Sequence, residues 1–247
     1  IHIIDSTKLD VVKNIIKELK PDEIYNLSGQ SSVSKSFLTP QDTFYSIAKV
    51  SLNILESIKS LNFKCRFYNA SSSECFGDTG DVSSNEKTNF NPCSPYGVAK
   101  SSAFWLTKNY RDSYNLFVCS GILFNHESPL RPKKFVTKKI VRTAVKIYFG
   151  EQIKLVLGDL SIKRDWGWAP DYVEAMWLIL QNDNPEDFVI STGKLSSLEY
   201  FVEHVFIYLN LNWKENTYID KKYFRPFELK SSYGDSQKAK AILGWEA

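Results

Sequence analysis

Apolar residues along the first two thirds of the chain recur with two different spacings. Where they return every three or four positions they predict amphipathic helices; these segments are residues 9–19, 47–61 and 101–114. Short apolar runs between the helices predict strands; these are residues 23–27, 65–70 and 117–123. Strands that alternate with helices are typical of a parallel sheet, in which ligands bind at the carboxyl ends of the strands.

The spacing of apolar residues becomes less regular after Pro129. It still predicts helices, at residues 135–148, 171–181 and 198–209. Two further strands are expected, at residues 153–157 and 188–191, and the second should return to the main sheet. The whole pattern therefore predicts an α/β protein with a doubly wound parallel sheet and a smaller C-terminal α/β part.

Composition narrows the class of protein. Of the 247 residues 43% are hydrophobic and 24% charged, as in an ordinary globular protein, and the chain is long enough for one large or two small domains. The net charge of +3 comes from scattered Lys and Arg residues, which gives no support for nucleic-acid binding. No apolar run has the length that crosses a bilayer, so no membrane contact is expected.

The four cysteines are far apart, and none forms a C-x-x-C pair. With only three histidines in addition, we expect no metal site. Cysteines without such spacing are typical of reduced thiols, which favours a cytoplasmic location.

A possible reaction centre lies in the middle of the chain. Tyr96 and Lys100 are four residues apart, so on a helix they share a face, and the ammonium can favour the phenolate. Upstream, residues 71–73 offer three hydroxyls and Glu74 a carboxylate. This set suits a dehydrogenase. Each of these residues also has a simpler explanation. Tyr-x-x-x-Lys can occur by chance on any amphipathic helix, and the serine hydroxyls can serve only as hydrogen-bond partners of backbone groups at the end of a strand. Glu74 can be an exposed carboxylate on the surface.

These residues resemble those of a known family. Tyr-x-x-x-Lys preceded by Ser is similar to the signature of the short-chain dehydrogenase/reductases, and residues 68–77 resemble their extended, sugar-nucleotide branch. Residues 121–129 (Gly-Ile-Leu-Phe-Asn-His-Glu-Ser-Pro) and 163–167 (Lys-Arg-Asp-Trp-Gly) are more specific. They resemble the GDP-mannose 4,6-dehydratase family, and the similarity continues through residues 171–177 and 185–190.

The resemblance implies a Rossmann-like NADP-binding domain of residues 1–128 and 159–195, and a sugar-nucleotide domain of residues 129–158 and 196–247. Such proteins hold the cofactor pyrophosphate at a Gly-x-x-Gly-x-x-Gly turn before a helix. None of the 11 glycines has that spacing, and residues 1–5 resemble the end of a later strand. We therefore expect an N-terminal truncation that removes a first βαβ unit of about 60 residues.

For the chemistry, the resemblance implies that GDP-mannose becomes a 4-keto-6-deoxy sugar nucleotide without net redox change, a step in GDP-fucose biosynthesis. Tyr96 would take the proton of the sugar 4-hydroxyl while C4 passes hydride to NADP. Ser72, where the family has Thr, would hydrogen-bond that oxygen. Lys100 would lower the pKa of the tyrosine and hold the nicotinamide ribose. Glu74 would remove the C5 proton and then help to expel the C6 hydroxyl as water.

Binding residues follow from the same resemblance. The implied cofactor contacts are Asp5, Ser6, Leu27, Ser28, Gly29, Lys100, His126 and Arg131. The implied substrate contacts are Asn125, Arg164 and Arg225 at the sugar diphosphate, and Glu228 at a ribose hydroxyl. The residues also fit simpler roles: a buried, satisfied histidine for His126, an Asx turn for Asn125 and an ion pair with carboxylates for Arg164.

Two other functions are compatible with the sequence. One is another nucleotide-sugar epimerase or reductase of the same superfamily, which needs Ser, Tyr and Lys but not a C5 base such as Glu74. The other is a catalytically silent, truncated nucleotide-sugar-binding protein. The expected partners are GDP-mannose and further copies of the chain, in a dimer or tetramer.

Overall fold

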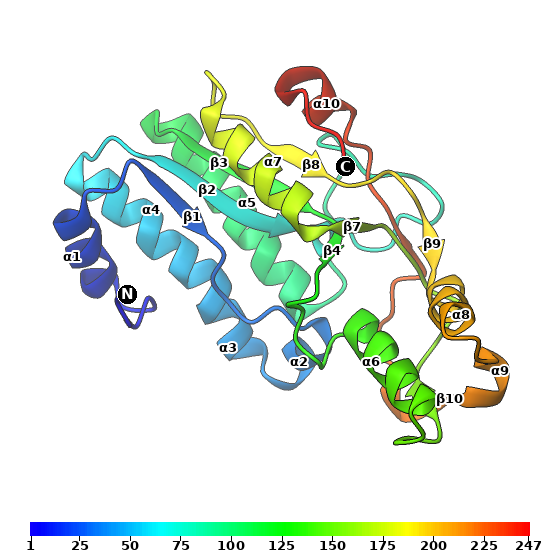
Figure 1. Cartoon of the computed structure of the whole chain (residues 1–247). Helices are drawn as coiled ribbons and strands as arrows, with labels where there is room; N and C mark the ends of the chain where they lie inside the picture. The colour runs from blue at the N-terminus through cyan, green and yellow to red at the C-terminus, as the bar shows by residue number, and fades with distance from the viewer.

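A computed structural model describes residues 1–247, and its centre is a four-stranded parallel sheet (Figure 1). The strands follow the order β1 (Glu23–Asn26), β2 (Arg66–Ser72), β3 (Val118–Leu123) and β8 (Phe188–Ile190). β2 and β3 are almost entirely buried because helices cover both faces of the sheet, and so most of their residues are apolar or small. The predicted parallel α/β sheet, including the return of residues 188–191, is confirmed.

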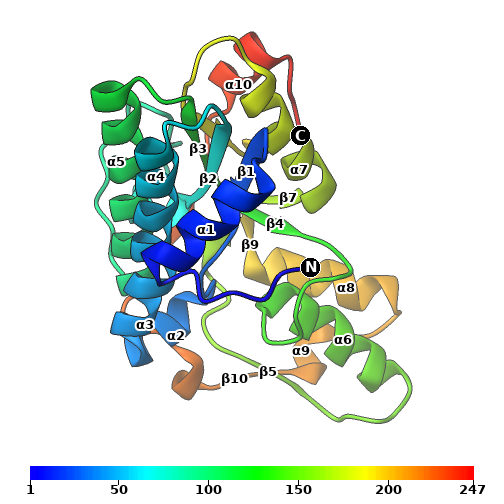
Figure 2. The same ribbon diagram turned by 90° about the vertical axis from the view of Figure 1, so that its left-hand side faces the viewer.

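Helices lie on both faces of this sheet (Figure 2). One face carries α1 (Leu9–Leu19), α4 (Val50–Leu61) and α5 (Pro95–Tyr114). The other carries α7 (Ala169–Gln181) and α10 (Gln237–Leu243). The predicted bounds of α1 hold, whereas α7 begins two residues before the predicted start. Pro170 in its first turn explains the difference, because a helix needs no N–H there.

The second group of elements lies beside the carboxyl ends of the sheet. Its helices are α6 (Val136–Tyr148), α8 (Leu198–Tyr208) and α9 (Trp213–Asn216), and a parallel pair joins β5 (Leu155–Leu157) to β10 (Thr217–Ile219). Ile140, Leu155 and Phe206 belong to a separate apolar cluster there. The remaining elements are α2 (Val33–Leu38), α3 (Pro40–Phe44), the π-helix η1 (Tyr45–Lys49), the 3-10 helices η2 (Ser73–Cys75) and η3 (Lys221–Tyr223), and the strands β4 (Asn125–Glu127), β6 (Lys163–Arg164), β7 (Trp166–Trp168), β9 (Ser196–Ser197) and β11 (Ser231–Ser232).

The main apolar core lies between the sheet and α7, and it extends to the last helix. Tyr68, Ile179 and Phe188 are fully buried in it, together with Ala239 of α10 and Trp245. The Trp245 indole N–H also donates to the Asp171 carbonyl at 2.9 Å. Residues 237–245 thus pack on the main sheet, although the resemblance assigned them to the smaller domain; the division into two domains stays a prediction.

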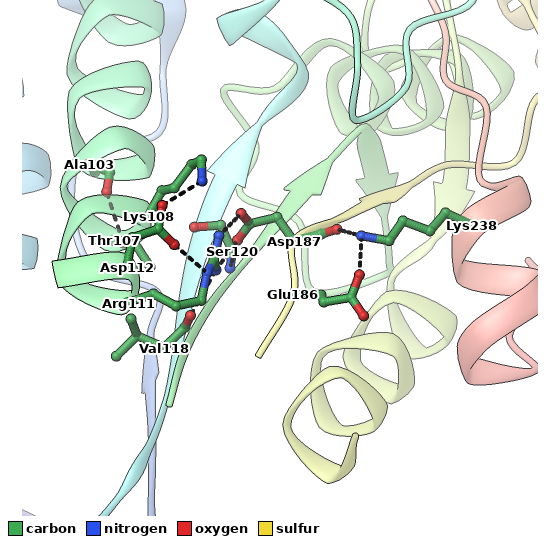
Figure 3. Close-up of polar contacts among 10 residues, drawn as sticks. All are labelled: Ala103, Thr107, Lys108, Arg111, Asp112, Val118, Ser120, Glu186, Asp187 and Lys238. Carbon is green, nitrogen blue, oxygen red and sulfur yellow. Dashed lines mark hydrogen bonds and ion pairs between the residues drawn. The ribbon is translucent and has the colours of Figure 1, made fainter. Parts of the chain in front are cut away.

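A nearly buried ion pair ties α5 to the sheet (Figure 3). Arg111 makes two hydrogen bonds to the Asp187 carboxylate, at 2.9 and 2.5 Å, and also donates to the Val118 carbonyl at 2.9 Å. Asp187 accepts in addition from the Ser120 N–H at 2.7 Å, and its carbonyl accepts from Lys238 of α10 at 2.9 Å. The pair therefore joins α5, β3, β8 and α10.

The strand end that was expected at residues 1–5 is wrong for this structure, because these residues have no regular structure. A strand needs a neighbour for its backbone hydrogen bonds, and no strand lies beside them. Ile1 and Ile3 are fully exposed. None of the helices is both long and apolar enough to cross a membrane.

Candidate active site

The predicted catalytic residues meet where β2 ends and α5 begins. β2 ends at Ser72, and Glu74 follows in η2. Ser94 caps α5 by accepting from the Gly97 N–H at 3.0 Å, which sets Tyr96 and Lys100 in its first turns. α5 approaches η2 so closely that a Cβ on Gly97 would lie 2.7 Å from the Glu74 carbonyl oxygen. Glycine at position 97 therefore allows the two segments to meet.

Lys100 is buried and hydrogen-bonded to β2. Its Nζ donates to the Ala70 carbonyl at 2.7 Å and lies 5.8 Å from the centre of the Tyr96 ring. Burial lowers the pKa of Lys100 to about 8, while the thiol of Cys75 acts in the opposite direction. An ammonium has three donors, and only one of those of Lys100 has a partner here. Two donors are therefore free for a ligand.

The expected lowering of the tyrosine pKa is not found in these residues alone. Burial raises the pKa of Tyr96, and the Ser72 hydroxyl and the Arg131 guanidinium only partly oppose it. The desolvation of a phenolate outweighs these neighbours. The lowering by Lys100 stays a prediction for the protein with its cofactor.

Glu74 is not the exposed surface carboxylate of the alternative interpretation. Its side chain lines the cleft, and burial raises its pKa, while the charges of Arg225 and Arg164 act to lower it. Glu228 acts in the same direction as burial. A carboxyl group with a raised pKa can both take and return a proton near neutral pH, which is what a general base that later acts as an acid requires.

The cleft lies between the sheet and the smaller group of helices and has a volume of about 260 Å³. Its wall brings together segments that are far apart in the sequence, from α2 to the loop before β11. The positively charged residues that line it are Arg131, Lys134, Lys139, Arg164 and Arg225, and the negatively charged ones are Glu74, Glu127, Asp159 and Glu228. Such a set can bind an anion with several charges.

Two arginines in this cleft share one carboxylate oxygen. Oε1 of Glu228 accepts from Arg164 at 2.8 Å and from Arg225 at 3.1 Å. Arg164 is only 5% exposed and donates also to the Lys163 and Leu229 carbonyls, both at 2.9 Å. The ion pair that was the alternative for Arg164 is therefore present. It does not exclude a substrate contact, because all three side chains line the cleft.

The segment from β4 to the following turn contributes three of the predicted residues. Asn125 and Arg131 line the cleft, and Arg131 lies 3.1 Å from Glu127 and 3.7 Å above the Phe135 ring. His126 stacks on Tyr172, with ring centres 4.7 Å apart. Its Nδ1 lies 2.9 Å from the Phe124 carbonyl, and burial lowers its pKa. His126 thus matches the alternative interpretation of a histidine whose ring has its hydrogen-bond partner inside the protein. Its contact with a cofactor stays a prediction.

The other predicted cofactor contacts do not line this cleft: Asp5 and Ser6 on the adenine side, and residues 27–29 in the loop beside NADP. The Asp5 carboxylate binds the Thr7 N–H and hydroxyl, at 3.1 and 2.6 Å, and the Ser6 carbonyl accepts from Asn53 at 3.0 Å. Leu27 and Gly29 follow β1, and the hydroxyl of Ser28 between them bonds to Asn26 at 2.5 Å. These residues remain candidates by position, at the carboxyl end of a strand.

Comparison with known proteins supplies the observation that decides the family. A sequence model described as GDP-mannose 4,6 dehydratase matches residues 1–247. GDP-mannose 4,6 dehydratase 2 of Arabidopsis thaliana is 47% identical over 250 residues, which cover 100% of this chain and 67% of the relative. The chain belongs to the GDP-mannose 4,6-dehydratase family. The human GDP-mannose 4,6 dehydratase is 44% identical over 265 residues, covering 100% of this chain and 71% of the relative.

Solved structures support the fold of this GDP-mannose 4,6-dehydratase family member. RMD from Pseudomonas aeruginosa, solved with NADPH, has a TM-score of 0.89 at 23% identity and covers 99% of this chain and 82% of its own. A dTDP-glucose 4,6-dehydratase from Bacillus anthracis, solved with NAD, has a TM-score of 0.84 at 21% identity and covers 98% and 73%. At these identities the likeness shows the Rossmann-like fold alone.

The sequence reasoning gave no role to Asp165, which supports the site from behind Arg164, although it lies in the motif at residues 163–167. Asp165 is fully buried, and its carboxylate accepts from the Thr192 N–H and hydroxyl at 3.0 and 2.7 Å and from the Gly193 N–H at 2.9 Å. It fixes the turn between Arg164 and β7, which pairs with β4. The available signal was an acidic residue directly after two basic ones and before Trp166.

Proposed function

We propose that this protein is a GDP-mannose 4,6-dehydratase that converts GDP-mannose to GDP-4-keto-6-deoxymannose and water with NADP. The observation that carries the proposal is the position of Glu74, a partly buried carboxyl group with a raised pKa in the same cleft as two arginines and next to the start of α5. A dehydrogenase or epimerase needs no such base, whereas elimination of water does.

The proposed proton transfers use three side chains at the end of β2 and the start of α5. Tyr96 takes the proton of the sugar 4-hydroxyl, and the Ser72 hydroxyl holds that oxygen. Once C4 is a ketone, the C5 proton is acidic and Glu74 removes it. Protonated Glu74 then gives its proton to the departing C6 hydroxyl, so that water leaves and the carboxylate is restored. C5 finally takes back a proton from Tyr96, which restores the phenolate.

The residues present fit the nicotinamide side of NADP. Lys100 has two free donors at the carboxyl end of β2, where ribose hydroxyls could accept, and Ser28 and Gly29 lie at the end of the neighbouring β1. Asp5, Ser6, Leu27, His126 and Arg131 would complete the site. When bound, NADP accepts hydride from C4 and returns it to C6, which makes the overall reaction redox-neutral.

For the substrate we assign the diphosphate to Arg164 and Arg225, with Asn125 beside them and Glu228 near a ribose hydroxyl. A guanidinium group can bind a phosphate through two parallel N–H···O hydrogen bonds. Both arginines line the cleft that holds Glu74. Residues 1–128 and 159–195 would form the NADP domain, and residues 129–158 and 196–247 the sugar-nucleotide domain.

Location and assembly belong to the same proposal. All four cysteines are free, which is typical of a reducing compartment such as the cytoplasm. We expect a homo-oligomer, because several large apolar side chains on η1 and α5, among them Tyr45 and Trp105, are about half exposed.

The direct test is to incubate the purified protein with GDP-mannose and NADP. The expected result is a 4-keto sugar nucleotide that has lost the C6 hydroxyl, with no accumulation of NADPH. Production of NADPH in step with sugar oxidation would instead identify a simple dehydrogenase. Formation of a C4 epimer without loss of water would favour the epimerase alternative.

A further inference from the structure

A buried network of polar side chains lies behind the loop that follows β1. Asn26, the last residue of β1, is buried together with its neighbours Asn69 and Ser51. Nδ2 of Asn26 donates to the Ser51 hydroxyl at 3.0 Å and to Oδ1 of Asn69 at 3.1 Å. Its Oδ1 accepts from both the N–H and the hydroxyl of Ser28, at 3.3 and 2.5 Å. The amide of Asn26 therefore uses both of its donors and both of its acceptor positions.

This network is more than a local turn. The two bonds between Asn26 and Ser28 alone would form an Asx turn, which needs no partner outside its own residues. Ser51 belongs to α4 and Asn69 to β2, and they lie 25 and 43 residues away from Asn26 in the sequence. The position of Ser28 is thus fixed from the neighbouring strand and from a helix on one face of the sheet.

The same network holds the residue against which the loop packs. The Ser51 hydroxyl donates to the carbonyl of Ile47, in the π-helix η1, at 2.8 Å. Gly29 has a φ of +106°, and a Cβ at this position would lie 2.5 Å from Cγ1 of Ile47. Ile47 is buried in a cluster with Ala99, and Tyr96 packs against this cluster. The loop and the tyrosine of the reaction centre therefore lie against the same small apolar cluster.

We propose that Asn26 is a positioning residue, which holds Ser28 and Gly29 in the place where they contact the nicotinamide side of NADP. This inference rests on the proposed function for the cofactor, and it adds the residue that sets the cofactor loop. Because the Ser28 hydroxyl gives its hydrogen to Asn26, it can only accept from a ligand, for example from a ribose hydroxyl. A loop that is fixed before binding loses less conformational entropy when the ligand arrives, which raises the affinity.

The test compares Asn26→Ala with the unchanged protein by isothermal titration with NADP and with GDP. Without the amide the loop loses both bonds at Ser28, so NADP should bind about tenfold more weakly. GDP is expected in the cleft, which residues 27–29 do not line, and its affinity should change by less than about threefold. Amide hydrogen exchange, followed by mass spectrometry without ligand, should become faster in residues 27–30, because the Ser28 N–H loses its acceptor.

Ser57→Ala is the matched control for the loss of a buried polar group near the same sheet. The Ser57 hydroxyl is buried in α4 and bonds only to the Asn53 carbonyl of its own helix. This variant should leave NADP affinity and hydrogen exchange in residues 27–30 unchanged, even where it lowers the melting temperature. If Asn26→Ala does not fold, Asn69→Ala takes its place, because it removes one partner of the Asn26 amide and should produce the same split between NADP and GDP in weaker form.

Two results would overturn the inference. An equal loss of NADP and GDP affinity would mean that Asn26 only stabilises the fold. Unchanged NADP affinity would mean that the loop keeps its position without Asn26. If the unchanged protein does not bind NADP, the cofactor part of the proposed function fails and hydrogen exchange decides. Faster exchange confined to residues 27–30 would then still support the positioning role, and unchanged exchange would refute it.

Discussion

At the scale of single residues, burial decides which groups hold protons at this site. It raises the pKa of both Tyr96 and Glu74 and lowers that of Lys100, so each group is held closer to its neutral form. Neutral acids and an ammonium that can lose its proton suit a reaction in which protons move between enzyme and sugar. Without a ligand, both acids are therefore held towards their protonated forms, and the lower pKa that Tyr96 needs as a base is expected only with the cofactor bound.

Tyr96→Phe should remove most of the turnover but leave GDP-mannose affinity within several-fold. The hydroxyl takes part in proton transfer in the transition state, and a general acid or base of this kind increases the rate about 10²–10⁴-fold. Steady-state kinetics and equilibrium binding on the same preparation provide the measurement. Unchanged turnover would exclude Tyr96 from the mechanism.

Glu74→Gln should separate the two halves of the reaction. Oxidation at C4 needs Tyr96 rather than Glu74, so a 4-keto sugar that keeps its C6 hydroxyl is expected to accumulate. Mass spectrometry of the bound nucleotide sugar detects it. If no oxidised sugar forms and NADP also stays unreduced, Glu74 has another role.

The same substitution should stabilise the protein in a pH-dependent way. Burial raises the pKa of Glu74 above its unfolded value, so the folded state favours the protonated form, and this stabilisation is lost as the pH rises through the raised pKa. At neutral pH the melting temperature of Glu74→Gln should therefore exceed that of the unchanged protein. The rise should be about 2–4 °C for each kcal/mol that the ionised Glu74 costs the folded state. The difference should vanish near the unfolded pKa of about 4.3. An equal difference at both pH values, by calorimetry, would contradict this account.

Sequence reasoning predicted Ser72, Glu74, Tyr96 and Lys100 from their recognisable chemistry, and the structure brings them together where β2 ends and α5 begins. Their catalytic roles stay predictions. It could not find the bonds made by Asp165 or the shared position of Glu228. Both depend on partners that lie dozens of residues away, at Thr192 and Arg164. Local patterns contain no information on such long-range pairs.

At the scale of elements, strong periodicity gave reliable predictions. The apolar face of α1 and the buried strands β2 and β3 were predicted close to their observed bounds. No helix or strand was predicted for the segment from η3 to β11, because two-residue strands such as β11 have too few positions to show a pattern. The position of β11 is set by its pairing with β6.

The approach of α5 to η2 predicts a sharp effect of Gly97→Ala. The added Cβ would lie 2.7 Å from the Glu74 backbone oxygen, so α5 must move and Tyr96 and Glu74 must shift apart. Turnover should fall about 10²-fold, since misplacement by 1 Å has such effects, while GDP binding changes little. Ser102→Ala is the control, because its hydroxyl bonds only to its own helix at Val98. Equal turnover in both variants would show that the contact can relax.

The ion pair of Figure 3 predicts a large difference between two salt bridges of one helix. Arg111→Met leaves Asp187 without its cation at a position about 10% exposed, which should cost about 3–5 kcal/mol in urea unfolding. Lys108→Met breaks an exposed pair with Asp112 and should cost less than about 1 kcal/mol. Similar losses in the two variants would refute the distinction.

At the scale of the whole molecule, the expected homo-oligomer can be tested directly. Light scattering after size-exclusion chromatography should give a mass at least twice that of one chain. Trp105→Glu places a charge on the half-exposed apolar surface of α5 and should reduce that mass. A monomeric unchanged protein would contradict the assembly.

The packing of Trp245 on the main sheet has a consequence for how the protein is made. During synthesis the four strands emerge from the ribosome long before residues 237–245, yet Tyr68 and Phe188 share their core with Ala239 and Trp245. The part of the sheet's apolar surface that residues 237–245 cover therefore stays exposed until these residues have been synthesised. Contacts between residues so far apart in the sequence slow folding. The partly folded chain exposes apolar surface in the meantime, and chaperones bind such species.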